Sequence, residues 1–149
     1  MPKIAITTGQ LDTLECLLTR IGIDASEFTN PSGSGHINLF SLVSTSHKNQ
    51  TGNGATRYAG TEGARFPVAQ TELFNETSAL QAYDIVMVNC AASGFFAPHG
   101  GYMTADFIRK LRSYVDGGGK AFLEHYFAGF LMAEGSLTTA PYGDIASWP

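Results

Sequence analysis

The first thirty residues combine a short apolar run with a stretch of helical spacing. Residues 3–7 read Lys-Ile-Ala-Ile-Thr and are followed by Thr8 and Gly9, a pattern that predicts a buried strand ending in a turn. Apolar residues then recur at the spacing of a helix: Leu14, Leu17, Leu18 and Ile21. Asp12 and Glu15 resemble a capping box, and Gly22 is placed to end the helix. This region therefore predicts a strand, a turn and a helix.

The same alternation returns in the second half of the chain. Residues 83–90 read Tyr-Asp-Ile-Val-Met-Val-Asn-Cys, and their four consecutive apolar residues predict a central strand covered on both faces. One apolar stripe predicts the next helix: Phe107, Ile108, Leu111, Tyr114 and Val115. The glycines at 117–119 stop that helix, residues 121–123 predict another core strand, and residues 127–133 predict the start of a further helix.

The middle of the chain, at about residues 30–70, is rich in Gly, Asn, Ser and Thr and predicts a loop-rich elaboration. We expect short strands at residues 27–29, 37–40 and 65–68, and a short helical piece near residues 78–81. So long a stretch without periodicity is either an ordered elaboration of the domain or a segment that binds a ligand or partner.

Strands that alternate with helices predict one α/β domain over residues 1–149, with a mainly parallel sheet and helices on both faces. In such sheets ligands bind outside the carboxyl ends of the strands. That rule selects three stretches, 7–12, 89–96 and 124–127, and brings Asp12, Cys90 and His125 to one expected rim.

Composition narrows the possible partners. Charged residues make up 15% of the chain, against about 25% in an average soluble domain, and the formal net charge is −4. Without a basic cluster nucleic acid is not expected, and no apolar stretch approaches the roughly 20 residues of a membrane span. A polar but uncharged surface favours an extracellular protein or a self-associating subunit, although Met1 leads into the first strand without a secretion signal.

The order of strand 83–88, helix 107–115, glycines 117–119 and strand 121–125 resembles the core of class I glutamine amidotransferase-like proteins, and its ThuA-like branch in particular. Secreted surface proteins of myxobacteria and their relatives carry similar domains. The resemblance implies a three-layer, flavodoxin-like (Rossmann-like) fold. It does not imply glutaminase activity, because Glu124, His125 and Tyr126 occupy the place of the family's nucleophilic Cys and no late His-x-Glu pair follows.

Cys90 supports three different readings. It ends a core strand at the expected rim, so it could act as a thiolate nucleophile with His125 as the base and Glu124 beside it. It could equally form a disulfide with Cys16, at the same edge of the sheet, which would indicate an oxidising compartment. The third reading is that Cys16 and Cys90 are two separate buried thiols that act as small hydrophobic residues.

The remaining candidates favour binding. Five residues at the strand ends are candidate ligand-binding residues: Thr8, Asp12, Asn89, Phe95 and Tyr126. Aromatic side chains in these loops can stack on carbohydrate or form a protein interface. His125, Glu124, Asp12 and Glu15 lack the spacing of a metal motif, and no glycine pattern fits a phosphate loop, so we expect neither metal nor cofactor.

These observations favour a binding or assembly module of a larger extracellular or cell-surface bacterial protein, whose partner is a protein, another copy of the chain or a carbohydrate. The alternative is a hydrolase-type enzyme with a pocket at Asp12, Cys90 and His125. Modification of the native thiols, and a mass measurement before and after reduction, would separate these readings.

Overall fold

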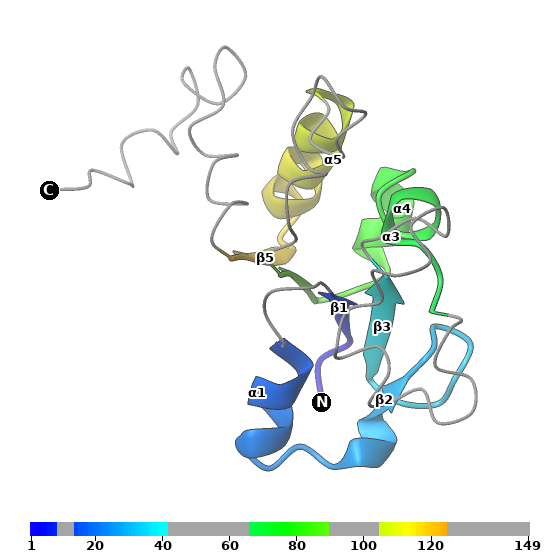
Figure 1. The fold of residues 1–149 in the computed structure, drawn as a ribbon. Helices are drawn as coiled ribbons and strands as arrows, with labels where there is room; N and C mark the ends of the chain where they lie inside the picture. Colours follow the sequence, from blue (N-terminus) through cyan, green and yellow to red (C-terminus); the bar gives the residue numbers. More distant parts are fainter. Residues whose placement is uncertain (9–13, 42–65, 90–104, 125–149) are drawn as a thin grey trace, which may run out of the picture.

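The centre of the protein is a five-stranded sheet in which all neighbouring strands are parallel (Figure 1). The structure is a computed structural model, and it describes residues 1–8, 14–41, 66–89 and 105–124. The strands are β1 (Ile4–Thr8), β2 (Phe28–Thr29), β3 (Ile37–Ser41), β4 (Ile85–Val88) and β5 (Lys120–Leu123). Their order across the sheet is β2-β3-β1-β4-β5. The predicted mainly parallel α/β sheet is confirmed, and the flavodoxin-like expectation agrees with this architecture.

β1 lies in the middle of the sheet because its residues are apolar or small on both faces. All five of its residues are buried, and Ile4 pairs with Ile37 of β3 on one side and with Ile85 of β4 on the other. From β1 the chain passes to β2 at one edge of the sheet, returns to β3 beside β1, and then crosses to β4 on the other side of β1. This reversal of direction places the topological switch point between β1 and β4.

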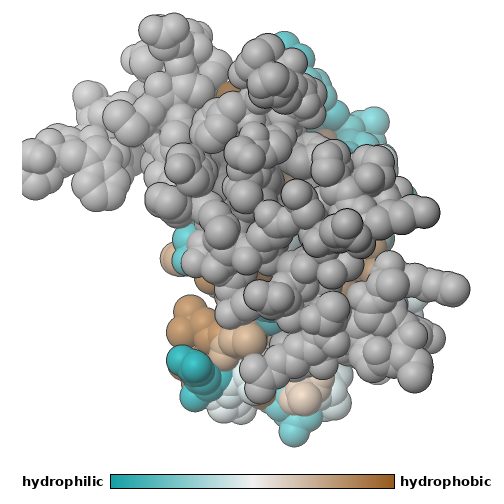
Figure 2. Space-filling model, viewed as in Figure 1, coloured by the Kyte–Doolittle hydropathy of each residue, from teal (hydrophilic) through white to brown (hydrophobic). Residues whose placement is uncertain are grey.

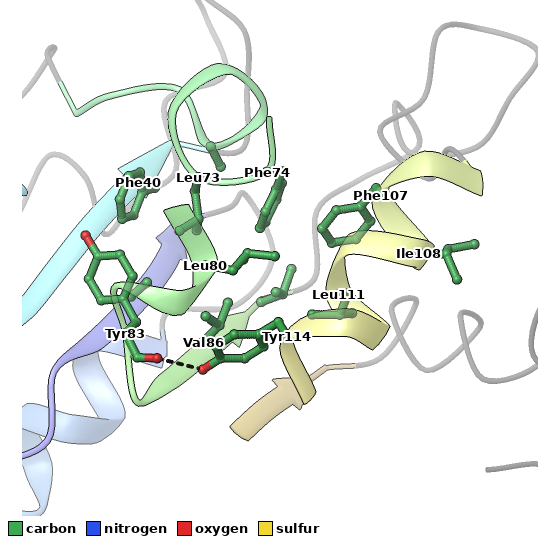
Figure 3. Close-up of a cluster of buried hydrophobic side chains, with 13 residues drawn as sticks. Phe40, Leu73, Phe74, Leu80, Tyr83, Val86, Phe107, Ile108, Leu111 and Tyr114 are labelled. Carbon is green, nitrogen blue, oxygen red and sulfur yellow. Dashed lines mark hydrogen bonds between the residues drawn. The ribbon is translucent and has the colours of Figure 1, made fainter. Parts of the chain in front are cut away.

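Helices cover both faces of the sheet, as predicted (Figure 1). On one face α1 (Leu14–Arg20) packs Leu14 and Leu18 into a cluster with Ile6 and Leu39. On the other face lie α3 (Ala69–Glu72), α4 (Thr77–Gln81) and α5 (Ala105–Asp116). Figure 3 shows the second cluster, which includes Leu80 of α4 and the buried stripe of α5: Phe107, Ile108, Leu111 and Tyr114. The stripe predicted from the sequence is thus the face that packs on the sheet.

The buried face of α1 differs from the one that its apolar pattern predicts. Leu14 and Leu18 are buried, but Leu17 and Ile21 are 49% and 68% exposed. The position between the two buried leucines is taken by Glu15, which is wholly buried. Figure 2 shows the resulting apolar patch on the surface at α1, beside hydrophilic atoms. Four leucine and isoleucine residues at helical spacing are more than this short helix needs to cover the sheet.

The connection from β2 to β3 departs from the usual rule for parallel strands, which are joined by a dozen or more residues and usually a helix. Here residues 30–36, which we call the return loop, bring the chain back directly. β2 is only two residues long, so the return is short. The loop lies close against β2, since a Cβ atom on Gly35 would come within 2.2 Å of the carbonyl oxygen of Glu27. The predicted loop-rich middle therefore contains an ordered turn, the predicted strand β3 and, at Val68, a single bridge to Ser41.

The turn between α5 and β5 depends on close packing against Tyr114. Gly118 has a φ of 96°, a left-handed conformation that glycine adopts without strain. At Gly119 a Cβ atom would lie 2.2 Å from the Tyr114 ring. The Tyr114 hydroxyl donates to the carbonyl oxygen of Tyr83 at 3.1 Å, which joins α5 to the beginning of β4 (Figure 3).

Candidate functional site

The carboxyl ends of β1, β4 and β5 lie side by side at one edge of the sheet. β4 pairs with β1 and with β5, and all three strands run in the same direction. Thr8 ends β1, Asn89 follows β4, and Glu124 follows β5 with its N–H donating to the carbonyl oxygen of Val88 at 3.0 Å. The expectation that these segments share one rim is therefore confirmed for the strand ends.

The described polar side chains at this rim bind one another and the backbone. Thr7 Oγ1 donates to Asn89 Oδ1 at 3.0 Å and accepts from the Asn89 N–H at 3.1 Å. Thr8 Oγ1 donates to the carbonyl oxygen of Phe40 at 3.1 Å. These three residues are buried, so each contact satisfies a polar group that water does not reach. The contacts explain Thr8 and Asn89 as supports of the sheet, and their role in ligand binding stays a prediction.

Glu15, in the first turn of α1, and Glu124, which follows β5, both have carboxylate oxygens that are shielded from water, although Glu124 as a whole is only partly buried. Both carboxylate oxygens of Glu15 are buried, and so is Oε2 of Glu124. Burying a carboxylate costs free energy unless other groups hydrogen-bond to it. Buried carboxylates are common in active sites. Within the described ranges no cluster of three or more His, Cys, Asp or Glu residues could hold a metal ion.

Most of the residues predicted for catalysis and binding lie outside the described residues: Asp12, Cys90, Phe95, His125 and Tyr126. Cys16 lies on α1 and is partly buried. Its predicted disulfide partner, Cys90, is among the residues just named, so the disulfide stays a prediction. The nucleophile, its base and the aromatic binding loops remain predictions in the same way.

A groove lies away from this rim, between the return loop, β3 and the helices α3 and α4. Its volume is about 460 Å³, within the range of roughly 300–1,000 Å³ that small-ligand sites occupy. Nine residues line it: Asn30, Pro31, Ser32, Phe40, Pro67, Glu72, Ala79, Ala82 and Tyr83. Most of this lining is apolar, and the polar groups are an amide, two hydroxyls and one carboxylate. A ligand with apolar parts and hydrogen-bond donors fits such a lining better than an anion does.

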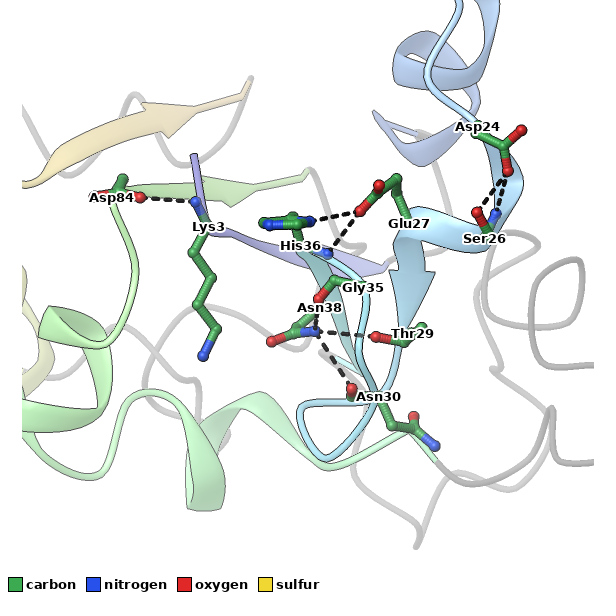
Figure 4. Close-up of polar contacts among 10 residues, drawn as sticks. All are labelled: Lys3, Asp24, Ser26, Glu27, Thr29, Asn30, Gly35, His36, Asn38 and Asp84. Carbon is green, nitrogen blue, oxygen red and sulfur yellow. Dashed lines mark hydrogen bonds and ion pairs between the residues drawn. The ribbon is translucent and has the colours of Figure 1, made fainter. Parts of the chain in front are cut away.

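Asn38 connects the two sides of this groove. Its side chain is wholly buried, and Nδ2 lies 3.3 Å from both Thr29 Oγ1 and the carbonyl oxygen of Asn30 (Figure 4). Its Oδ1 accepts a hydrogen bond of 3.1 Å from the Tyr83 hydroxyl. Burial raises the pKa of Tyr83, which keeps this hydroxyl a donor at neutral pH. The Tyr83 ring also meets Phe40 edge to face, with centroids 6.0 Å apart.

The sequence contained one signal of this network that our prediction did not use. Asn38 interrupts an otherwise apolar strand of Ile37, Leu39 and Phe40. A polar residue inside a buried run needs hydrogen-bond partners, and here those partners come from the return loop and Tyr83.

A second, more polar pocket lies at the amino ends of β4 and β5, away from the rim, and shares Tyr83 with the groove. Its volume is about 410 Å³, and the amino end of β5, the glycines 117–119, Asp84 and Tyr114 contribute to its lining. The Asp84 carboxylate accepts the backbone N–H of Lys3 at 2.7 Å. Because the groups of this pocket serve the turn between α5 and β5, we assign it a structural role.

Comparisons with protein-family models, with curated proteins and with solved structures find no match to this chain. None of the helices in the described part of the chain is long and apolar enough to cross a membrane. The groove and the rim are therefore the two places in the described part of the chain where a function can be sought.

Proposed function

We propose that this protein is a binding or assembly module, and that its ligand occupies the groove between the return loop and α4. The groove itself carries this proposal. It has the volume of a ligand site and a mainly apolar lining with a few polar groups, which is the composition of binding pockets in general.

The lining indicates the class of ligand. Among the described residues that line the groove, Glu72 is the one with a charge, and Asn30 and Ser32 add an amide and a hydroxyl. A carbohydrate or a peptide segment offers both hydrogen-bond donors and apolar surface, whereas a phosphate or a carboxylate would be repelled by Glu72. Carbohydrate and protein are also the partners that the sequence favours.

Assembly has separate support in α1. Leu17 and Ile21 are four residues apart and therefore lie on the same side of the helix, where both are largely exposed. Exposed apolar side chains that lie together often belong to an interface. The proposal includes a place in a larger extracellular or cell-surface bacterial protein, supported by the low charge of the chain and by its resemblance to ThuA-like and other class I glutamine amidotransferase-like domains.

The proposal excludes glutaminase activity. β5 ends at Leu123, and the residue that follows it is Glu124 in place of the nucleophilic Cys of the amidotransferases. The side chain that performs the reaction in that family is therefore missing from its position.

The test uses two tryptophan variants of the same helix, α4. Ala79→Trp fills the groove, whereas Ser78→Trp adds the same ring at an exposed position that does not line it. Both variants and the wild type are titrated with a panel of neutral oligosaccharides and of neutral and cationic peptides, by calorimetry. We expect a panel member to bind the wild type and Ser78→Trp but not Ala79→Trp. Equal binding by all three proteins would contradict the groove as the site.

A hydrolase-type enzyme is the second candidate, and the shielded carboxylate oxygens of Glu15 and Glu124 favour it. Glu124 follows β5 at the rim to which Asp12, Cys90 and His125 are assigned, and Glu15 lies in the first turn of α1. The assay is hydrolysis of p-nitrophenyl esters and glycosides. Activity in the wild type that is lost in Cys90→Ser and His125→Asn variants, both with a normal fold, would support this candidate. A mass increase of two hydrogens on reduction of the native protein would show a Cys16–Cys90 disulfide and would exclude a thiol nucleophile.

A further inference from the structure

The return loop is both a wall of the groove and a segment without secondary structure of its own. Asn30, Pro31 and Ser32 line the groove at one end of the loop, and His36 joins β3 at the other. The position of this wall therefore depends on the contacts that hold the loop against the sheet.

One carboxylate oxygen holds the end of the loop. Glu27 Oε2 accepts the backbone N–H of His36 at 3.0 Å and lies 2.8 Å from its Nδ1 (Figure 4). Both the backbone and the side chain of His36 are thus fixed by a single group. Next to them, Gly35 leaves no room for a side chain against Glu27.

Asn38 holds the beginning of the loop, and its contacts are uncharged. Its Nδ2 has two hydrogens for three acceptors, at 3.3 Å from Thr29 Oγ1 and the Asn30 carbonyl and at 3.4 Å from the Gly35 carbonyl. These bonds do not change with pH, so among the contacts of the loop with described residues the one with Glu27 is the contact that protonation can weaken.

The surroundings of Glu27 favour its charged form. The hydrogen bonds from the backbone and side chain of His36 lower the pKa of Glu27 from 4.5, and the His36 ring and the α-amino group of Met1 act in the same direction through their charge. On the same turn, Asp24 is engaged with Ser26 instead. Since the pKa of Glu27 is lowered in the folded protein, its contribution to stability is complete above pH 4.5 and is lost as the pH falls through the folded pKa.

We propose that Glu27 and His36 form an acid-sensitive latch that holds the return loop against the sheet, so that protonation of Glu27 loosens this wall of the groove and weakens ligand binding. The effect on binding rests on the proposed function of the groove. The latch itself does not, because it concerns only the attachment of the loop.

Hydrogen–deuterium exchange of the full chain tests the latch without a ligand. Peptides that cover residues 30–38 are followed at pH 7 and at about pH 3.5, with rates corrected for the pH dependence of intrinsic exchange, and β1 serves as the internal reference for global unfolding. Loss of the Glu27 charge from this exposed contact is expected to raise the corrected exchange of these loop amides roughly two- to fivefold at the lower pH. Glu27→Gln keeps an oxygen acceptor without the titrating charge, so its loop exchange is expected not to depend on pH. Asp24→Asn is the matched control from the same turn, and it is expected to follow the wild type.

The proposal is overturned if the loop of the wild type exchanges equally at both pH values relative to β1, or if Glu27→Gln keeps the pH dependence of the wild type. The titrations with Ala79→Trp separate this result from the function of the groove. A working latch with equal ligand binding by Ala79→Trp and Ser78→Trp would remove the groove as the binding site and leave the latch in place.

Discussion

Thr7 and Asn89 exchange two hydrogen bonds across the carboxyl ends of β1 and β4, at the switch point of the sheet. One threonine oxygen both donates to the Asn89 side chain and accepts from the Asn89 backbone. The contact joins two residues 82 positions apart in the sequence, and it fixes the end of β4, from which the chain continues towards Cys90. The end of β4 at this rim is therefore held by a hydroxyl that is itself buried in the sheet.

Removal of this hydroxyl should destabilise the fold. Thr7→Val keeps the shape of the side chain and leaves the buried N–H of Asn89 without this acceptor, so we expect the free energy of unfolding to fall by about 1–3 kcal/mol. Thr7→Ser retains the hydroxyl and should lose less. Urea denaturation of both variants measures the difference, and a Thr7→Val variant as stable as the wild type would show that these hydrogen bonds do not stabilise the fold.

The orientation of α1 makes a second prediction, because two adjacent leucines have opposite surroundings. Leu18→Ala empties a buried position and should cost about 2–5 kcal/mol of unfolding free energy. Leu17→Ala shortens an exposed side chain and should change the free energy of unfolding by no more than about 0.5 kcal/mol. Thermal and denaturant unfolding of the two variants decide the matter. If Leu17→Ala proved the more costly, α1 would be rotated from the orientation described.

The turn after α5 should not tolerate a larger residue at Gly119. A methyl group there meets the Tyr114 ring, so Gly119→Ala should cost about 1–3 kcal/mol of unfolding free energy through overpacking. If the ring is the cause, adding Gly119→Ala to a Tyr114→Ala variant should cost clearly less than adding it to the wild type. Strict additivity in this double-mutant cycle would locate the strain elsewhere.

The partners of Glu27 and Asp24 can be separated by titration. His36→Ala should raise the pKa of Glu27 part of the way towards 4.5, because the variant loses the side-chain hydrogen bond and the charge of the ring but keeps the backbone N–H, whose hydrogen bond lowers this pKa most. The pKa of Asp24 should stay below 3.8 in the same variant, because Ser26 alone is its partner. Side-chain carboxyl shifts followed by NMR give both values in one experiment. A Glu27 pKa that His36→Ala leaves unchanged would show that the histidine does not set it.

The elements that the sequence predicted well are those in which the local pattern and the tertiary burial agree. The apolar run of residues 85–88 became a central strand, and the stripe from Phe107 to Tyr114 became the buried face of α5. At α1 the pattern offered more apolar positions than the sheet could cover, and Glu15 took a buried place that no periodicity indicates. α3 was not predicted, since four residues give too short a pattern.

The groove lies beyond what a local pattern can predict. Its lining comes from three segments that are far apart in the chain, around Pro31, Pro67 and Ala79, and these meet only because the return loop folds back on β2. The rim was easier to predict from the sequence, because the carboxyl ends of parallel strands lie at the same edge of a sheet. That rule places Thr8, Asn89 and Glu124 correctly while leaving open what the rim binds.

Backbone amide shifts of the ¹⁵N-labelled protein locate the bound ligand. The protein is titrated with whichever oligosaccharide or peptide of the panel binds, and the shifted amides are assigned. If the ligand occupies the groove, the largest changes fall at Asn30, Ser32 and Glu72 and at residues 79–83. Changes concentrated instead at Thr8, Asn89 and Glu124 would show that the ligand does not bind in the groove and would move the functional site to the rim of the sheet.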